Sequence, residues 1–427
     1  MISWEGLRCR RDAGVDGRPS FFFCGGEGMC DTNRICKLAQ EMKETLITDR
    51  RTIHMQPELA FCEEKTSAFV QARLKELGIE YKTGYAKTGV VGMIHGKKGA
   101  GKTLLLRADM DALPILEEND VAYRSKTDGR MHACGHDSHV AMLLGAAKLL
   151  KAMEQELCGT VKLMFQPAEE GAGGAEPMIE DGLLEEPKVD AALALHVEPT
   201  YPCGKIAVKS GALMASPDEF DIIIKGKGGH GAYPHNTVDP VLTAAKVIEG
   251  LQSITARNVD AAVPAVVSVC QINGGQFYNV IPGEVRLGGT TRAFDDATRK
   301  LLSERIEQVT RGICDAMGAD YSYEFRYMYP PLINDAAMTE LVTQSARAVV
   351  GDENVIRLQT PFMGGEDFSY VANKVPASYF YVGCRNEEKG CVHQWHSAEF
   401  NLDEDCLPLG VSVFAEAALR FFNGAEQ

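Results

Sequence analysis

The chain has 427 residues, with 44 Lys and Arg against 59 Asp and Glu and a formal net charge of −15. Because its basic runs are short, it lacks the positive face that nucleic-acid binding needs, and without a stretch of about 18 apolar residues it has no predicted membrane span. A hydrophobic fraction of 45% fits a globular protein, and at about 150 residues per domain the length predicts two or three domains.

The N-terminal segment and the cysteines indicate a reducing compartment. Residues 1–28 mix charged residues and glycine around one apolar run that is too short for a secretory signal, so we predict a disordered extension, with Met29 as a suitable start. The 13 cysteines are odd in number and scattered, unlike a disulfide framework. We therefore expect a cytoplasmic protein in which Cys158, Cys270 and Cys314 are buried, inert thiols.

After the extension, helical and strand patterns alternate along the chain. Apolar spacing predicts helices over 32–51, 64–77, 138–153 and 177–182, and short apolar runs predict buried strands over 89–94, 102–107, 160–165 and 191–196. Such alternation is typical of an α/β protein whose parallel sheet is covered by helices on both faces.

Between residues 216 and 327 the order changes to β-α-β-β-α-β, the pattern of a ferredoxin-like domain. Strands are predicted over 219–225, 265–273, 283–291 and 321–326, and helices over 240–254 and 295–317. The α/β pattern then returns with a strand at 377–382 and a closing helix at 407–422. We therefore predict a discontinuous larger domain, residues 29–215 and 328–427, with a smaller domain inserted at 216–327.

Polar side chains of metal-binding types lie at the ends of several predicted elements. Asp109 and Asp111 directly follow the strand at 102–107, at the sheet edge where ligands bind in α/β proteins, with a solvated turn as the alternative. Cys134 and His136 are two residues apart and can face one site, and thiolate and imidazole suit zinc and similar metals.

Two more residues near the same helix have structural readings. Asp137 is placed either to cap the helix or to accept a hydrogen bond from an imidazole. His139 lies inside the helix, where a structural role is the simpler one.

Glu169 and Glu170 follow the strand at 160–165. Adjacent carboxylates repel each other, so a nearby cation or a raised pKa is expected, although exposed glutamate pairs are common. One glutamate could hold a metal while the other acts as general base on metal-bound water, the division that metal-assisted hydrolysis requires.

Histidines complete this set of polar residues. His196 ends the strand at 191–196, where a lone histidine is usually a core residue, and His393 and His396 share a late loop. Four strand ends or loops of one sheet thus supply metal-binding side chains, which packing alone does not explain.

Seven short motifs occur in the order found in one known family. The chain resembles the amidohydrolase branch of the aminoacylase/carboxypeptidase metallopeptidases, which includes hippurate hydrolases, N-acetyl-diaminopimelate deacetylases and plant auxin-conjugate hydrolases. The resemblance extends from about residue 49 to residue 422, and its motifs are Asp109–Pro114, His132–Asp137, Gln166–Gly171, Leu195–Val197, Gly229–His235, Asn279–Pro282 and Gly364–Phe368.

The resemblance implies a di-metal peptidase-like catalytic domain. Two divalent metal ions, zinc or manganese with cobalt and nickel as further candidates, would bind to Cys134, His136, Glu170, His196 and His396. Glu169 would be the general base. Asp111 would orient a ligand, because the wider clan has His-x-Asp where this chain has Asp109 and Asp111. His396 fits the family pattern better than His393, since the residues after it match.

The resemblance also implies roles for the smaller domain, which would serve as a lid and as the contact of a homodimer. His230 would reach the substrate carbonyl in the neighbouring subunit. Asn279 and Arg292 match positions that hold the substrate carboxylate, and Arg suits that task through bidentate hydrogen bonds.

The hypothesis is hydrolysis of the amide bond of a small-molecule N-acyl amino acid, giving a carboxylic acid and a free amino acid. Glu169 would take a proton from metal-bound water and His230 would stabilise the oxyanion. The alternatives are a dipeptidase or carboxypeptidase of the same clan, and a catalytically silent relative that binds acyl amino acids. The intact Glu169 and ligand set favour an enzyme, while the motifs leave the acyl group, the amino acid and the metal open.

Overall fold

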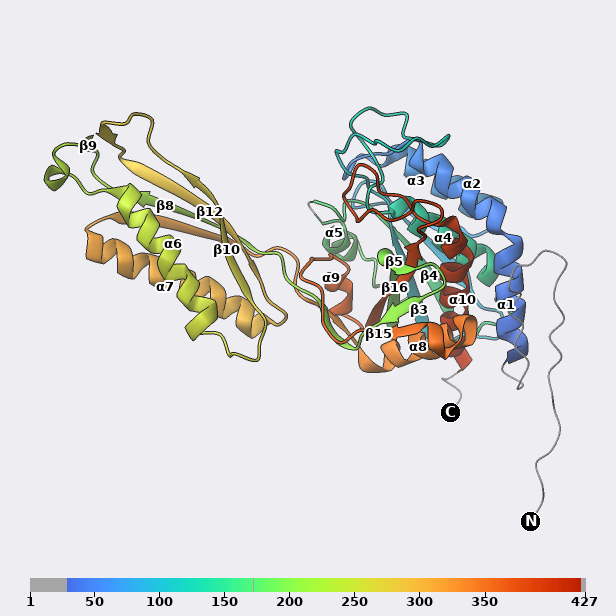
Figure 1. The fold of residues 1–427 in the computed structure, drawn as a ribbon. Coiled ribbons are helices and arrows are strands. Elements are labelled where there is room, and N and C mark those ends of the chain that lie inside the picture. Colours follow the sequence, from blue (N-terminus) through green and yellow to red (C-terminus); the bar gives the residue numbers. More distant parts are fainter. Residues whose placement is uncertain (1–28, 172, 424–427) are drawn as a thin grey trace, which may run out of the picture.

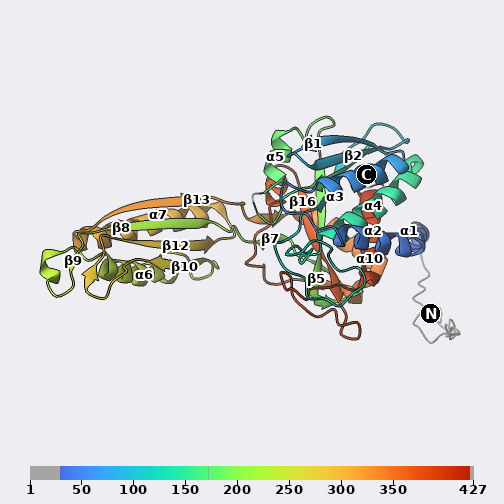
Figure 2. The same cartoon turned by 90° about the horizontal axis from the view of Figure 1, so that it is seen from above.

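The computed structural model describes residues 29–171 and 173–423, and the extension predicted for residues 1–28 lies outside them. The described chain forms a large α/β domain and a small domain that projects from it (Figures 1 and 2). Among the described residues, no helix is both long and apolar enough to cross a membrane.

A mixed sheet of eight strands forms the base of the large domain, in the order β1-β2-β4-β3-β5-β16-β6-β15. The strands are β1 (Glu80–Tyr85), β2 (Gly89–His95), β3 (Thr103–Asp109), β4 (Thr160–Gln166), β5 (Ala191–Pro202), β6 (Ile206–Val208), β15 (Val355–Arg357) and β16 (Ala377–Arg385). The central strands β4, β3, β5 and β16 are mutually parallel.

The outer strands depart from the predicted parallel sheet. β2 is antiparallel to β4, and β6 is antiparallel to β16. The connection between β5 and β6, residues 203–205, is too short for a crossover, so the chain reverses direction there. The prediction of a parallel sheet is therefore right for the centre of the sheet and wrong for its edges.

Side chains that alternate along the sheet fill two cores. On β5, Leu193, Leu195 and Val197 belong to one core, and Ala192 and Ala194 belong to the other. The first core is covered by α1 (Met29–Glu41), α2 (Lys43–His54), α3 (Glu64–Glu76), α4 (His136–Ala152), α8 (Ala336–Val350) and α10 (Leu407–Asn423). The second is covered by α5 (Ala175–Glu180) and α9 (Ser369–Ala372), so helices lie on both faces as predicted.

The single helix predicted over 32–51 is two helices, α1 and α2, which meet at Met42. The Met42 N–H is shared between the carbonyls of Leu38 and Ala39, at 3.2 Å each. α1 packs mainly on α10 while α2 packs on α4, so a change of direction at Met42 lets each helix bury its apolar face.

The small domain is a four-stranded antiparallel sheet with two helices on one face. Its elements in chain order are β8 (Glu219–Lys225), α6 (Pro240–Arg257), β10 (Val266–Asn273), β12 (Glu284–Arg292), α7 (Asp296–Met317) and β13 (Asp320–Arg326). The strand order β10-β12-β8-β13 is the one that a ferredoxin-like β-α-β-β-α-β unit has. Asp239 and Asp295 cap the two helices by accepting N–H groups of the first turn.

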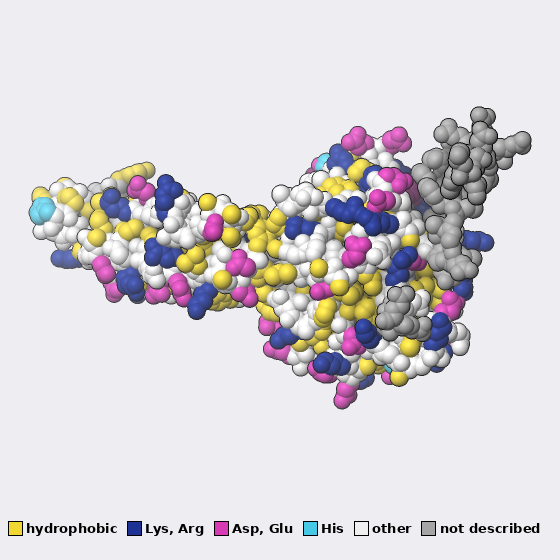
Figure 3. Space-filling model, turned by 90° about the horizontal axis from the view of Figure 1, so that it is seen from below, with side chains coloured by type: hydrophobic (Ala, Val, Ile, Leu, Met, Phe, Trp, Pro, Cys, Tyr) yellow, Lys and Arg dark blue, Asp and Glu magenta, His cyan; other side chains and the backbone are white. Residues whose placement is uncertain are grey.

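Two short ribbons complete the fold. β9 (Gly229–His230) pairs with β11 (Val280–Ile281) at the far tip of the small domain, and β7 (Gly211–Met214) pairs with β14 (Leu332–Asn334) beside the junction of the domains. Apolar side chains gather where the domains meet, and a histidine lies at the far tip (Figure 3). The domain boundaries at 216 and 327, like the lid and dimer roles of the small domain, stay predictions.

The prediction of three buried thiols is right only for Cys314. Cys270 is exposed because it lies in a bulge of the edge strand β10, where the register shifts between Val269 and Gln271. Cys158 is half-buried in the turn before β4.

Candidate metal centre

The carboxyl ends of three central strands bring the predicted site residues to one edge of the sheet. Asp111 follows β3, Glu169 and Glu170 follow β4, and His196 lies within β5. This edge is where ligands bind in open α/β sheets.

Five predicted ligands, here called the ligand set, meet at this edge as two overlapping triads. Ligand atoms within each triad lie within 4.8 Å of one another, and both triads contain Cys134: the first adds His136 and His196, and the second adds Glu170 and His396. Cys134 Sγ is 3.3 Å from His196 Nε2, and His396 Nε2 is 3.3 Å from Glu170 Oε1.

The local backbone explains how the ligands converge. Gly135, between two ligands, has φ of 93°, and a Cβ there would lie 2.5 Å from a methyl group of Val197, so only glycine fits. His396 also has positive φ, 64°, and its N–H donates to the carbonyl of Ala133 at 2.9 Å. A non-glycine residue persists in this region only when its surroundings hold it there, as a hydrogen bond does here.

Hydrogen bonds set the tautomers of two histidines. His136 Nδ1 donates to the carbonyl of Asp111 at 3.0 Å, and His196 Nδ1 donates to the carbonyl of Val197 at 2.7 Å. Each neutral ring therefore presents a bare Nε2 to the centre. The Asp111 carboxylate is also close to this ring, with Oδ1 3.2 Å from His136 Nδ1. Its other oxygen, Oδ2, accepts the N–H of Glu170 at 2.9 Å. Asp111 orients two members of the ligand set at once.

The centre fits a cation because buried ligand atoms there lack a hydrogen bond. His136 Nε2 and Glu170 Oε1 are both buried without a hydrogen bond, and they lie 3.9 Å apart. Such atoms are costly unless a ligand or water satisfies them. Imidazole, thiolate and carboxylate are also the donors that divalent transition metals prefer.

The pKa shifts describe a centre that is short of positive charge. Burial, followed by the charges of Glu170 and Glu169, raises the pKa of Cys134 well above its usual value. Burial alone would lower the pKa of His136, but Asp109 and Asp111 outweigh it and raise that pKa to about 10. A bound divalent cation would reverse both shifts, because it favours thiolate and neutral imidazole.

Asp109 and His139 also lie within 4.8 Å of His136, but they are already paired. His139 Nε2 accepts the N–H of Val197 at 3.0 Å, so Nδ1 carries the proton and donates to Asp109 at 2.6 Å. Asp109 also pairs with Arg107 at 2.6 Å. The pair supports the sheet edge, as the structural reading of His139 predicts.

Asp137 takes the second of its two predicted roles. It lies in the first turn of α4, where Gly135 is the cap residue. Its carboxylate accepts from His54 Nδ1 at 2.7 Å and from Arg50 Nε at 2.9 Å. Burial would raise the pKa of Asp137, but Arg50 and His54 lower it strongly. This buried pairing fixes the residue next to His136.

Glu169 faces two acidic residues to which the sequence reasoning gave no role. Its carboxyl lies within 4.8 Å of those of Glu366 and Asp367. Burial, followed by the charges of Glu366 and Glu170, raises the pKa of Glu169 well above its usual value. Both acids belong to the motif Gly364–Phe368.

Arg107 forms ion pairs with both Glu366 and Asp367. Its guanidinium donates to Glu366 at 2.8 Å and to Asp367 at 3.3 Å, and it is fully buried. A single arginine within the apolar run of β3 was the one signal in the sequence that buried carboxylates would be found nearby.

The late loop separates its two histidines. His396 joins the second triad, whereas His393 lies 3.5 Å from exposed Glu399. The choice of His396 as the metal ligand stays a prediction.

The remaining predicted residues do not reach the ligand set of their own chain. His230 and Asn279 lie together on the ribbon at the far tip of the small domain, where the Asn279 carbonyl accepts the N–H of Gly231 at 2.8 Å (Figure 1). Arg292, at the end of β12 beside the junction, donates to the carbonyl of Met363 at 3.0 Å.

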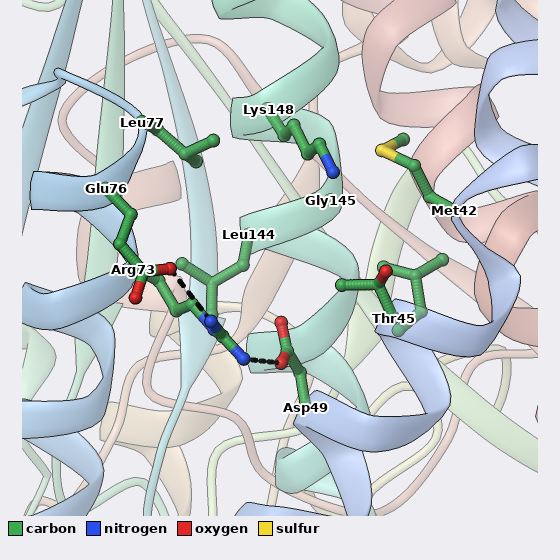
Figure 4. Close-up of a pocket in the computed structure, with 10 residues that line it drawn as sticks. Met42, Thr45, Asp49, Arg73, Glu76, Leu77, Leu144, Gly145 and Lys148 are labelled. Atoms are coloured by element: carbon green, nitrogen blue, oxygen red, sulfur yellow. Dashed lines mark hydrogen bonds and ion pairs between the residues drawn. The ribbon is translucent and has the colours of Figure 1, made fainter.

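A separate cavity of about 100 Å³ lies between α2, α3 and α4 (Figure 4). Arg73 spans its rim, with ion pairs to Asp49 at 2.6 Å and to Glu76 at 2.8 Å. The cavity borders the second half of α4, at Leu144, whereas His136 begins that helix. No predicted site residue lines it.

Comparison with known proteins agrees with this geometry. Thermostable carboxypeptidase 2 of Saccharolobus solfataricus is 42% identical over 90% of this chain and 97% of its own length. IAA-amino acid hydrolase ILR1-like 4 of Arabidopsis thaliana is 40% identical over 94% of this chain and 92% of its own. N-acetylcysteine deacetylase of Bacillus subtilis is 40% identical over 88% of this chain and 96% of its own length.

Solved structures resemble the whole described fold. The Bacillus subtilis YXEP protein, described as a dinuclear metal-binding peptidase of the M20 family, superposes with a TM-score of 0.79 at 35% identity, over 90% of this chain and 99% of that protein. The model of peptidase family M20/M25/M40 matches residues 105–420. With a buried set of metal-binding side chains at the sheet edge and this match over most of its length, the chain belongs to peptidase family M20/M25/M40.

Proposed function

We propose that the protein is a metal-dependent amidohydrolase that cleaves N-acyl amino acids to a carboxylic acid and a free amino acid. The observation that carries this proposal is the meeting of the ligand set beside a buried glutamate, Glu169, whose carboxyl lies within 4.8 Å of those of Glu170 and of a second acidic pair. The relatives named for N-acetylcysteine and for IAA-amino acids support the substrate class.

The ligand set would hold two divalent cations, with Cys134 common to both triads. A thiolate beside imidazole and carboxylate favours zinc, and manganese, cobalt and nickel accept the same donors. Such cations, when bound, supply Lewis-acid polarisation of the amide carbonyl and make the attacking water more acidic. The ten cysteines from Cys36 to Cys406 are free thiols, which suits the reducing cytoplasm we propose as the setting.

Glu169 moves the protons of the proposed reaction. It takes one from the attacking water and returns one to the nitrogen of the leaving amine, which is the work of a general base that becomes a general acid. Asp111 keeps His136 and Glu170 in place throughout.

The small domain would complete the site from a second chain. In the proposal, residues 216–327 form a homodimer contact and a lid, and His230 at the tip enters the partner subunit's site to stabilise the oxyanion. Asn279, on the same ribbon, would bind the substrate carboxylate there. Arg292 would meet that carboxylate through its guanidinium when the domains close.

A substrate panel tests this proposal. The purified chain, loaded in turn with zinc, manganese or cobalt, is incubated with acetyl, benzoyl and indole-acetyl amino acids, and release of the free amino acid is measured. Release that a chelator abolishes and added metal restores is expected. Glu169→Gln should retain its metal while turnover falls by about 10²- to 10⁴-fold. If no amino acid is released from any substrate, the proposal is refuted. The remaining hypothesis is then a catalytically silent relative that binds acyl amino acids.

A second candidate, a carboxypeptidase, is favoured by the relative that is 42% identical. Both activities cleave the amide that precedes a C-terminal amino acid, so they differ in what lies on the other side of that bond. Peptides with free N-termini, compared with the same amino acids bearing only an acyl group, separate the two. Faster cleavage of the peptides would favour the carboxypeptidase.

A further inference from the structure

The loop that carries the base has a backbone that other elements must hold. Residues 167–171, here called the glutamate loop, include Ala168 at φ of 58°, a region unfavourable for a residue with a Cβ. Just after the loop, a Cβ on Gly174 would lie 1.9 Å from the carbonyl oxygen of Pro167, so the chain folds back closely on itself. Contacts from outside therefore decide where Glu169 and Glu170 lie.

Two of these contacts come from the large domain and hold N–H groups. Glu63 accepts the N–H of Ala168 at 3.0 Å, and Asp111 accepts the N–H of Glu170 at 2.9 Å. Both acceptors are buried carboxylates. They fix one side of the loop backbone.

A third contact holds the carbonyl side of the loop. The Tyr329 hydroxyl lies 2.9 Å from the carbonyl oxygen of Glu169 and 2.7 Å from that of Gly171. A hydroxyl has one proton, so Tyr329 shares it between the two carbonyls. The Tyr329 hydroxyl thus bridges the carbonyl of the residue before Glu170 and the carbonyl of the residue after it.

Tyr329 belongs to the segment that leaves the small domain, residues 327–331, here called the hinge segment. The residue before it, Met328, is held by the small domain through both backbone groups. Its N–H donates to Asp218 at 2.8 Å, and its carbonyl accepts from Arg299 at 2.7 Å. Arg299 and Asp218 also form a bidentate ion pair at 2.6 and 2.7 Å.

The other side of Tyr329 is stiff. Pro330 and Pro331 fix their own φ angles, and a residue before proline is restricted to extended conformations. Tyr329 as a residue is only 8% exposed, and its ring has little free space around it, since a Cβ on Gly173 would lie 3.0 Å from the ring. A displacement of Met328 must therefore be passed on to the Tyr329 side chain.

We propose that Tyr329 is a positioning residue that couples the seating of the small domain to the placement of the glutamate loop. When the small domain moves, Met328 moves with it and the Tyr329 hydroxyl leaves the carbonyls of Glu169 and Gly171. The base and the neighbouring ligand then lose their working positions. The kinetic part of this inference rests on the proposed function, while its structural part does not.

Tyr329→Phe removes the hydroxyl and keeps the ring, and Tyr323→Phe is the matched control. The Tyr323 hydroxyl also donates to a carbonyl, that of Ser303 at 2.9 Å, but it lies within the small domain. Hydrogen exchange by mass spectrometry, on the zinc-loaded and the zinc-free full chain, reports on the amides of residues 168–175. We expect these amides to exchange about 3- to 10-fold faster in Tyr329→Phe and unchanged in Tyr323→Phe.

Kinetics at saturating zinc provide the second readout. Misplacement of the base lowers kcat, so Tyr329→Phe should lose about tenfold in kcat with KM within about twofold of wild type. A tyrosine that only stabilises the fold would lower the melting temperature and leave kcat unchanged. Tyr323→Phe should behave in that second way.

Arg299→Lys tests the coupling, because it loosens the hold on Met328 without touching the loop. We expect faster exchange at residues 168–175 and a kcat about threefold lower. In the Tyr329→Phe background the same change should have no further effect on either quantity, since the path is already broken.

The inference fails if loop exchange in Tyr329→Phe equals that of the wild type. It also fails if the effect of Arg299→Lys persists in full in the Tyr329→Phe background, because the small domain would then act by another path. Absence of hydrolysis by the wild type would refute the proposed function alone, and the exchange experiment would still decide on Tyr329.

Discussion

Removal of the Arg107 charge should destabilise the large domain in a way that depends on pH. Arg107 is fully buried and pairs with Asp109 at 2.6 Å, Glu366 at 2.8 Å and Asp367 at 3.3 Å. Burial, and the neighbouring Glu366, raise the pKa of Asp367 to about 8 despite Arg107, so this carboxyl already holds a proton at pH 7. Arg107→Met then leaves two carboxylates without their cation.

The cost can be worked out from proton uptake. Removal of one buried positive charge is compensated by uptake of one proton, and if Asp109, with an ordinary pKa of 3.8, takes it up, this costs about 4 kcal/mol at pH 7 and about 1.6 kcal/mol at pH 5. The value at pH 7 agrees with the roughly 3–5 kcal/mol seen when a buried ion pair loses one partner. The variant binds more protons folded than unfolded, so its stability falls as pH rises, by about 1.4 kcal/mol per unit.

Guanidinium unfolding at pH 5, 6 and 7, in chelator and followed by tryptophan fluorescence, to which Trp395 of the same domain contributes, measures this cost. The control is Arg347→Met, which removes a half-exposed arginine paired with Asp352 at 2.6 Å and should change stability by less than about 1 kcal/mol at every pH. A loss below about 1 kcal/mol for Arg107→Met at pH 7, or a loss that does not shrink toward pH 5, would show that the carboxylates do not depend on Arg107.

Three further outcomes follow from the contacts. His396→Ala should lower metal affinity by more than about tenfold in a chelator competition, whereas His393→Ala, whose ring pairs with the exposed Glu399, should leave it unchanged. Cys134→Ser removes the donor common to both triads, so metal content by mass spectrometry should fall below that of the wild type while circular dichroism stays the same. Lys162→Met removes the donor to three loop carbonyls, at 2.7, 2.8 and 3.0 Å, and should destabilise the fold by about 1–3 kcal/mol in the same guanidinium assay.

The elements of the small domain were predictable because each has a local signal. α6 and α7 have regular apolar faces, and Asp239 and Asp295 precede them as caps, so predicted and observed starts agree to within one residue. The strands β6 and β15 are only three residues long and depend on pairing with distant segments. No period can be read from three residues, so they were not predicted.

The predicted ligands likewise have local sequence signals, whereas the residues that hold them in place do not. The ligands and Glu169 sit in short motifs next to strand ends, where the chemistry of the side chains and their place in the chain point the same way. Glu366 is 259 residues from Arg107, and Tyr329 is 160 residues from the carbonyl it binds. Such pairings depend on how the two segments of the large domain fold together. A single sequence does not show which residues far apart in the chain will be in contact.

The charge balance of the centre links its metals to these supports. Six carboxyl groups lie at or beneath the sheet edge, and they are Asp109, Asp111, Glu169, Glu170, Glu366 and Asp367. Arg107 supplies one positive charge against them, and it pairs with Asp109, Glu366 and Asp367.

The carboxyls nearer to the ligand set accept hydrogen bonds from backbone N–H groups, which carry no net charge, and from histidines. Burial, followed by the neighbouring carboxylates, raises the pKa values of Cys134 and Glu169, so without cations these groups hold protons. Two divalent cations would take over that charge and release the thiol proton. The ion pairs of Arg107 with Asp109, Glu366 and Asp367 do not depend on the metal ions. The fold should therefore survive chelation, whereas the reaction should not.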